Sequence, residues 1–127
     1  MGARGESGPG EAGEKAAARF LRKLGYGILR KNYRARSGEI DIIARDGEEV
    51  VFVEVKTRSA ATWGDPENAV TPSKQMKVCR AAEEFASRNR LRERPLRFDI
   101  VAILIAEGQA PECRHYKDAF AIPPFMR

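Results

Sequence analysis

The chain has 127 residues, 43% of them hydrophobic and 32% charged, which is typical of one soluble globular domain with a buried core. The formal net charge of +5 favours an anionic partner, but it leaves nucleic acid, an acidic protein and a membrane surface open. Two cysteines without C-x-x-C spacing and one histidine exclude a zinc site. The longest apolar run is too short to cross a bilayer, so we expect a cytoplasmic protein.

The N-terminal segment changes character at about residue 11. Residues 1–10 are rich in glycine and predict a flexible leader, so residues 11–127 form the expected single domain. Apolar residues at helical spacing predict a helix over residues 11–24, which Gly25 would end. Glu14 borders the apolar face of this helix, where the simplest interpretation is a first-turn glutamate favoured by the helix dipole.

A first strand is predicted over residues 26–33, with Ile28 and Leu29 entering the core. A basic run accompanies and follows it, and a solvated strand edge and phosphate contact explain this run equally well. The run consists of Arg30, Lys31, Arg34 and Arg36.

The most informative stretch, residues 38–58, predicts a β-hairpin with its turn at Asp46-Gly47. Alternation predicts one apolar face, made by Ile40, Ile42, Ala44, Val51, Val53 and Val55, and one charged face, made by Glu39, Asp41, Glu54 and Lys56. We expect a loop of about four residues to place Asp41 opposite Glu54, and a loop of about two to place Glu39 there.

This charged face suggests chemistry, because like charges that face each other across strands are destabilising. A divalent cation such as Mg²⁺ removes the repulsion, since it is typically held by one or two carboxylates with waters and phosphate oxygens completing its shell. A lysine two residues beyond Glu54 points into the same space, where it could orient the attacking water or stabilise charge on phosphorus. The pattern indicates a metal-dependent phosphodiester-cleaving site.

The remainder of the chain predicts a loop, a helix and two strands. Trp63, in the loop, could stack on an unpaired base, but anchoring the loop to the core is the simpler interpretation. Thr71-Pro72 begins a helix whose expected buried stripe is Met76, Cys79, Ala82, Phe85 and Ala86. Lys74, Lys77 and Arg80 near its start could bind an anion or form a solvated face.

Residues 96–105 predict a strand buried on both faces, parallel to the strand that carries Glu54 because a helix connects the two. We expect Asp99 to satisfy a local backbone or arginine partner and His115 to have an exposed structural role. Residues 113–116 could form a short edge strand, and residues 118–120 could start a helical turn.

The motif Asp, then Glu-x-Lys on the next strand, resembles the active-site pattern of the PD-(D/E)XK nuclease superfamily. The longer strings GEID (residues 38–41) and FVEVKTR (residues 52–58) are similar to the YraN-type family of uncharacterised bacterial proteins. This resemblance extends over about residues 11–120, and Ile40 stands where the superfamily name has proline. It implies an α/β, restriction-endonuclease-like three-layer fold: a mixed central sheet with N-terminal hairpin strands and a βαβ crossover.

The same resemblance implies roles for individual residues. Asp41 and Glu54 would bind Mg²⁺ or Mn²⁺, with the Val55 carbonyl as a further ligand, and Lys56 would position or help deprotonate the attacking water. Glu39 and Glu14 would support them, since a first-helix glutamate reaches the metal in such nucleases. Lys74 and Gln75 match positions of active-site helpers, and related junction resolvases work as dimers, so a homodimer is possible.

The leading hypothesis is a metal-dependent nuclease acting on DNA, possibly branched or single-stranded. The expected nucleic-acid contacts are Arg34, Arg36, Arg58, Lys74, Gln75 and Lys77. One alternative is a nucleic-acid-binding module of the same fold with little or no catalysis, which salt-dependent binding without turnover would favour. Another is a protein-interaction domain whose basic surface meets an acidic partner.

Overall fold

A computed structural model describes residues 9–59, 70–91 and 93–121 of the chain. Within them the elements follow one another as α1 (Pro9–Lys23), β1 (Gly27–Ala35), β2 (Gly38–Asp46), β3 (Glu49–Ser59), α2 (Pro72–Arg88), β4 (Leu96–Ile105) and β5 (Glu112–Tyr116). Helix α1 therefore begins two residues before the predicted domain start at residue 11. The predicted loop with Trp63 lies outside the described residues.

The five strands form one mixed sheet in the order β1-β2-β3-β4-β5. Strands β1, β2 and β3 pair antiparallel, β3 and β4 pair parallel, and β5 closes the sheet antiparallel to β4. The predicted hairpin, the parallel pair around α2 and the short last strand are thus confirmed. Strand β4 is buried along most of its length, as expected for a central strand covered on both faces.

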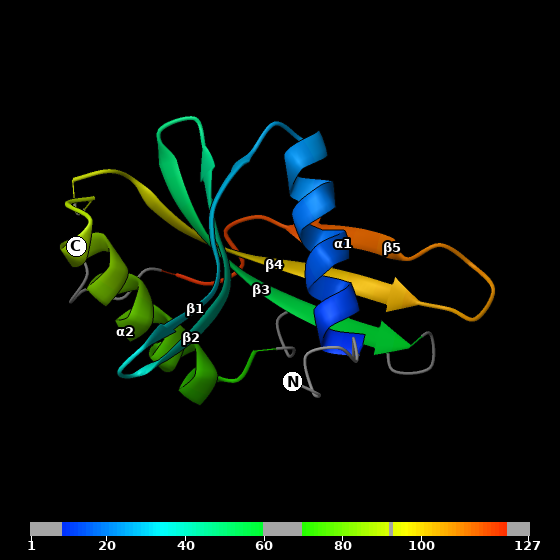
Figure 1. The fold of residues 1–127 in the computed structure, drawn as a ribbon. Coiled ribbons are helices and arrows are strands. Elements are labelled where there is room, and N and C mark those ends of the chain that lie inside the picture. Colours follow the sequence, from blue (N-terminus) through cyan, green and yellow to red (C-terminus); the bar gives the residue numbers. More distant parts are fainter. Residues whose placement is uncertain (1–8, 60–69, 92, 122–127) are drawn as a thin grey trace, which may run out of the picture.

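Each face of the sheet carries one helix, so the domain has three layers (Figure 1). On one face, Val78, Ala82 and Phe85 of α2 pack against strand residues that include Phe52 and Phe98. On the other face, Ala17, Ala18 and Leu21 of α1 pack against a second set that includes Val53 and Val101. Burying these apolar stripes against the sheet is what stabilises both helices, since neither would persist alone in water.

Strand β2 changes sides partway along its length. Ile42 and Ala44 pack under α1 with Val51 and Val53, as predicted, whereas Ile40 packs under α2. The prediction that Ile40 shares their face is therefore wrong. The reason lies in the pairing: β2 and β3 are paired only as far as Ile42 and Val53, while β1 and β2 stay paired to the end of their hairpin.

Beyond that point the β1–β2 hairpin lies against α2. A Cβ atom added to Gly38 would lie 3.1 Å from the Lys77 carbonyl oxygen and 3.2 Å from the Lys77 Cβ. The hairpin tip reaches the N-terminal half of α2, as Figure 1 shows at its lower left. A side chain at this position would require the hairpin or the helix to shift slightly, so glycine suits this close approach. A wedge therefore opens between β2 and β3.

Three smaller expectations are wrong. Leu29 is 41% exposed and Met76 is 42% exposed, so neither belongs to the core. Residues 118–120 form no helix, and Asp118 has a φ of 54°, in the left-handed region. Strand β1 has a register irregularity between Ile28 and Arg30, which turns Leu29 outward.

A buried charge network joins β4 to the hairpin end that lies away from the wedge. Arg97 donates to both carboxylate oxygens of Asp99 at 2.9 Å, and to Asp46 and Glu49 at 3.1 and 2.7 Å. His115 Nε2 lies 2.7 Å from Asp99 Oδ2. The arginine partner expected for Asp99 is confirmed, but the His115 side chain is only 8% exposed, so its predicted exposure is wrong.

Burial opposes ionisation of Asp99, yet these hydrogen bonds outweigh it and lower the pKa of the carboxyl below its ordinary value. The charged groups of this network have hydrogen-bond or ion-pair partners within it, so we assign the network a role in stabilising the fold. Among the described residues, neither helix combines the length and apolar character required to cross a membrane.

Candidate active site

The site begins where β2 separates from β3. Asp46 pairs with Glu49, so the hairpin loop holds two residues, and Gly47 adopts the left-handed φ of 62° that such a turn requires. This register, continued one residue past Ile42 and Val53, sets Asp41 opposite Glu54. The prediction that a two-residue loop would bring Glu39 opposite Glu54 is therefore wrong.

Asp41 occupies the start of the wedge. Its Oδ2 atom accepts a hydrogen bond of 2.8 Å from the Val55 backbone N–H. The side chain thus takes the place of a main-chain partner at the point where the strands part. This bond fixes the Asp41 carboxylate beside the strand segment that carries Glu54 and Lys56.

Glu54 is buried at the centre of the sheet, with 1% of its surface exposed. It lies beside Ile100 in the parallel ladder with β4. One carboxylate oxygen lies 3.8 Å from the Lys74 Nζ, and the other, Oε2, is buried with no hydrogen-bond partner among the described residues. A buried polar atom without a hydrogen-bond partner is costly, so the Oε2 atom is a candidate donor for a cation.

The electrostatics of the pair agree with this description. Burial, and then the nearby Asp41 carboxylate, raise the pKa of Glu54 to about 7, although Lys74 and Lys56 act in the opposite direction. Burial also raises the pKa of Asp41, against the Val55 N–H and the same two lysines. Both shifts favour the protonated forms of these two carboxyl groups.

The other predicted catalytic side chains surround this pair. Lys56, half-buried, acts electrostatically on both carboxylates. Glu14, on α1, is half-buried, and its pKa is raised by burial, then by Asp41 and more weakly by Glu39. Glu39 is exposed at the rim and also raises the pKa of Asp41. The structure thus places all five predicted catalytic residues in one acidic neighbourhood.

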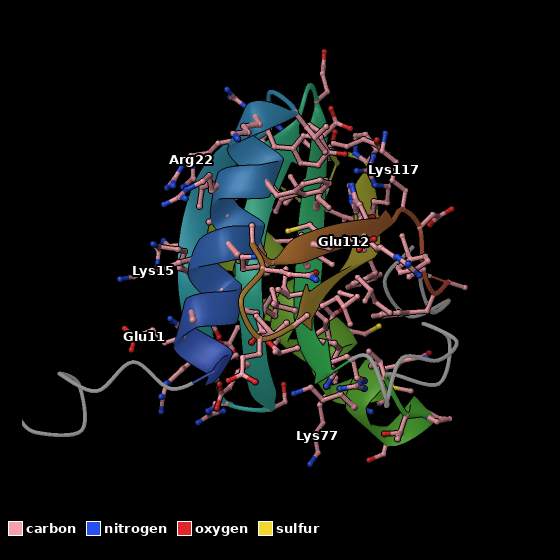
Figure 2. All side chains as sticks on the ribbon, turned by 90° about the vertical axis from the view of Figure 1, so that its right-hand side faces the viewer. Glu11, Lys15, Arg22, Lys77, Glu112 and Lys117 are labelled. Carbon is pink, nitrogen blue, oxygen red and sulfur yellow. The ribbon has the colours of Figure 1, made fainter. Side chains whose placement is uncertain are left out.

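Three elements meet at this edge: the N-terminal part of α1, the C-terminal half of β3 and the start of α2. In Figure 2 the labelled Glu11 of α1 and Lys77 of α2 both lie at the lower end of the domain, where β3 also ends. Gly13 brings α1 close to β3, because a Cβ at this position would collide with the Thr57 Oγ1. The sequence reasoning did not single out Gly13, although a glycine within a helix was a usable signal.

The predicted helper residues near the start of α2, Lys74, Gln75 and Lys77, have different surroundings. Thr71 caps the helix by accepting from the Lys74 N–H, which confirms the predicted start. Lys74 reaches Glu54, whereas the Gln75 side chain is engaged with the Val70 carbonyl at 3.0 Å. Lys77 is exposed and extends away from the domain (Figure 2).

The predicted arginines lie farther out. Arg34 and Arg36 are exposed on the β1–β2 hairpin, and the Arg36 backbone N–H donates to Glu84 of α2 at 3.4 Å. The half-buried Arg58 donates to the neighbouring Thr57 carbonyl at 3.3 Å. These residues border the site without contacting its carboxylates in any hydrogen bond or ion pair of the described residues.

The donor set at Asp41 and Glu54 fits a hard divalent cation. No group of three or more His, Cys, Asp or Glu side chains in the described ranges could hold a metal by itself. Mg²⁺ needs less, because one or two carboxylates suffice when waters and substrate oxygens complete its octahedron. Asp41 and the free Oε2 of Glu54 supply such a pair.

Comparison with known proteins places the chain in a family. The model of the uncharacterised protein family UPF0102 matches residues 13–103, which include most of α1, strands β1 to β3, α2 and most of β4. A UPF0102 protein of Geotalea daltonii is 48% identical over 111 residues, covering 87% of each chain. A UPF0102 protein of Rhodococcus opacus is 44% identical over 111 residues, covering 87% of this chain and 94% of its own. The YraN-like resemblance is thereby confirmed, and the chain belongs to the uncharacterised protein family UPF0102.

Proposed function

We propose that this protein is a divalent-metal-dependent nuclease that hydrolyses phosphodiester bonds in DNA. The observation that carries the proposal is the buried Glu54 carboxylate, whose Oε2 has no hydrogen-bond partner among the described residues. A carboxyl group buried beside Asp41 costs stability, and a bound cation would reverse that cost. The positive net charge of +5 suits a polyanionic substrate.

Each side chain has a role that follows from its place. Asp41 and Glu54 would hold Mg²⁺ or Mn²⁺, with the Val55 carbonyl as a further ligand. The cation would supply charge stabilisation at the phosphate and a more acidic water. Lys56 would position or help deprotonate the attacking water. Lys74 would lower the pKa of Glu54 and keep it ionised, while Glu39 and Glu14 would support the site from the rim.

We also propose that the three layers are those of the restriction-endonuclease-like fold. In support, the catalytic pattern lies on adjacent antiparallel strands, and the second of these pairs parallel with the strand after α2. The β2–β3 ladder ends at Ile42 and Val53, beside Asp41, and a phosphate would approach the carboxylates there.

The test is a cleavage assay on a substrate panel: linear, single-stranded, flap and four-way-junction DNA, each with Mg²⁺, Mn²⁺ or EDTA. We expect metal-dependent cleavage that Asp41→Ala or Lys56→Ala abolishes while both variants keep the circular-dichroism spectrum of the folded wild type. Lys117→Ala, which removes an exposed lysine elsewhere, is the matched control and should cleave like wild type. Undiminished cleavage by both site variants would refute the assignment.

A second candidate is a nucleic-acid-binding module of the same fold with little catalysis. The observation that favours it is the small donor set, since no group of three potential metal ligands occurs in the described residues. Salt-dependent DNA binding without turnover at any Mg²⁺ or Mn²⁺ concentration would select this alternative.

A further inference from the structure

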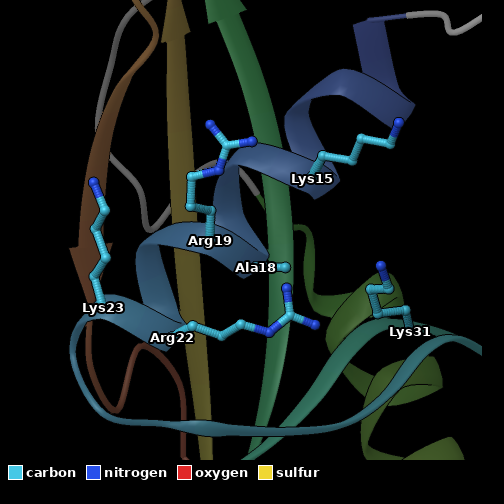
Figure 3. A pocket seen from close by; sticks show the side chains of 6 residues that line it. All are labelled: Lys15, Ala18, Arg19, Arg22, Lys23 and Lys31. Carbon is cyan, nitrogen blue, oxygen red and sulfur yellow. The ribbon is translucent and has the colours of Figure 1, made fainter.

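A basic hollow lies on the outer side of α1, apart from the carboxylates. It has a volume of about 350 Å³, and its lining includes four cations of α1 and one of β1: Lys15, Arg19, Arg22, Lys23 and Lys31. Figure 3 shows the Arg22 guanidinium and the Lys31 ammonium extending into the space between α1 and β1. Ala18, at the floor, is the remaining lining residue.

These cations have no carboxylate partner in the part of the chain that the structure describes. None of the five forms an ion pair with a carboxylate within residues 9–59, 70–91 and 93–121. Two pairs along α1, Lys15 with Arg19 and Arg19 with Lys23, have the four-residue spacing at which like charges destabilise a helix. The helix dipole favours Arg22 and Lys23 in the last turn, but it does not account for Lys15 or Lys31.

A lipid surface is a poor match for this helix. A helix that binds membranes presents an apolar face to the lipid next to its basic face. The apolar face of α1 is used in the core, where Ala17 and Leu21 are fully buried. What remains outside is charge, which is the composition of a surface that contacts a phosphate backbone.

The dimensions fit a nucleic-acid strand. The cations extend from Lys15 to Lys23, a rise of about 12 Å along the helix axis. Duplex DNA carries one phosphate per strand for about every 3.4 Å of its axis, so the row spans about three phosphates.

Two residues that line the hollow, Lys15 and Lys31, are adjacent in sequence to residues near the candidate active site. Lys15 follows Glu14 in α1, and Lys31 precedes Asn32, whose side chain hydrogen-bonds to Glu14. A backbone lying along the hollow therefore runs toward Asp41, whose charge acts on Glu14.

We propose that the hollow between α1 and β1 is a docking surface for the sugar-phosphate backbone of the DNA whose scissile phosphate enters the site. The inference rests on the proposed nuclease function and names a second contact surface for it. Because this surface holds the backbone in the ground state and the transition state alike, its loss weakens binding without slowing the bound reaction.

The test uses the full chain and a fluorescein-labelled 20-base-pair duplex in EDTA, so that cleavage does not interfere. The triple variant Lys15→Gln/Arg19→Gln/Arg22→Gln is compared with a control of equal charge change that alters exposed cations elsewhere: Arg45→Gln/Arg94→Gln/Lys117→Gln. We expect the first triple to raise the Kd at least tenfold and to reduce the slope of log K against log salt by about 2 to 3. The control should raise the Kd by no more than twofold.

Equal weakening by both triples would overturn the proposal, because it would mean that net charge alone attracts DNA. The same variants are also tested for binding to phosphatidylserine vesicles. The proposal would be overturned as well if the α1 triple variant kept wild-type DNA affinity, or if it lost affinity only for the vesicles. A single-turnover cleavage assay at saturating enzyme separates the two claims. If the α1 triple variant cleaves and binds DNA like wild type, the docking surface is refuted and the nuclease proposal is unaffected. If the α1 triple variant loses DNA affinity but no form of the protein cleaves DNA, only the nuclease proposal is refuted.

Discussion

Replacing Glu54 by glutamine should stabilise the metal-free protein at alkaline pH. Glutamine keeps the shape of the side chain and removes the charge. The pKa of Glu54 rises from 4.5 to about 7 on folding, so the folded state favours the protonated form. The fold therefore loses stability as the pH rises from about 4.5 through 7, and Glu54→Gln escapes this loss.

The size of the effect follows from the two pKa values. The rise corresponds to about 3 kcal/mol of unfolding free energy, fully lost above about pH 8. The gain in unfolding free energy of Glu54→Gln is smaller than this, because Lys74 loses its ion-pair partner at 3.8 Å. We expect a net gain of about 2 kcal/mol at pH 8, or on the order of 5–10 °C in Tm, and almost none at pH 4.

The assay is urea unfolding followed by circular dichroism at pH 4, 6 and 8, in EDTA and then in MgCl₂. Glu107→Gln, which changes an exposed glutamate, is the control and should leave the pH dependence as in wild type. Mg²⁺ should raise the unfolding free energy of the wild type at pH 8 by about 2.7 kcal/mol at a concentration 100 times the Kd, and it should not raise that of Glu54→Gln. A glutamine variant that is less stable than wild type at pH 8 in EDTA would refute the reasoning.

Three further predictions concern neighbouring features. Arg97→Met should destabilise the fold by about 3–5 kcal/mol in urea unfolding, since it leaves the fully buried Asp99 charge without its main partner; a loss below 1 kcal/mol would contradict this. Gly38→Ala should cost about 1–3 kcal/mol, because the new methyl group would lie 3.1 Å from a carbonyl oxygen of α2, and an unchanged Tm would show that the hairpin moves freely. Lys74→Met should raise the pKa of Glu54 and so move the acid limb of the pH–rate profile for cleavage upward, whereas an unmoved limb would exclude its electrostatic role.

Local sequence patterns were enough to predict most of the elements. Alternation and the Asp46-Gly47 turn predicted the hairpin, Thr71-Pro72 predicted the start of α2, and the long apolar run predicted the buried strand β4. Helices, turns and strands are formed by residues close together in the chain, so the spacing of apolar residues indicates each element directly. The clustering of Asp41, Glu54 and Lys56 likewise followed from their spacing on adjacent strands.

Only the tertiary structure decided how that cluster is arranged. The separation of β2 from β3, and with it the side on which Ile40 packs, depends on the contact between Gly38 and α2, which is remote in sequence. The choice of Lys74 over Gln75 and Lys77 as the partner of Glu54 depends on the rotation of α2 above the sheet. The burial that raises the pKa of Glu54 comes from several elements at once, so no local pattern carries it. The sequence by itself therefore determined which chemical groups come together, and the packing of the helices on the sheet determined their charge and their access to a ligand.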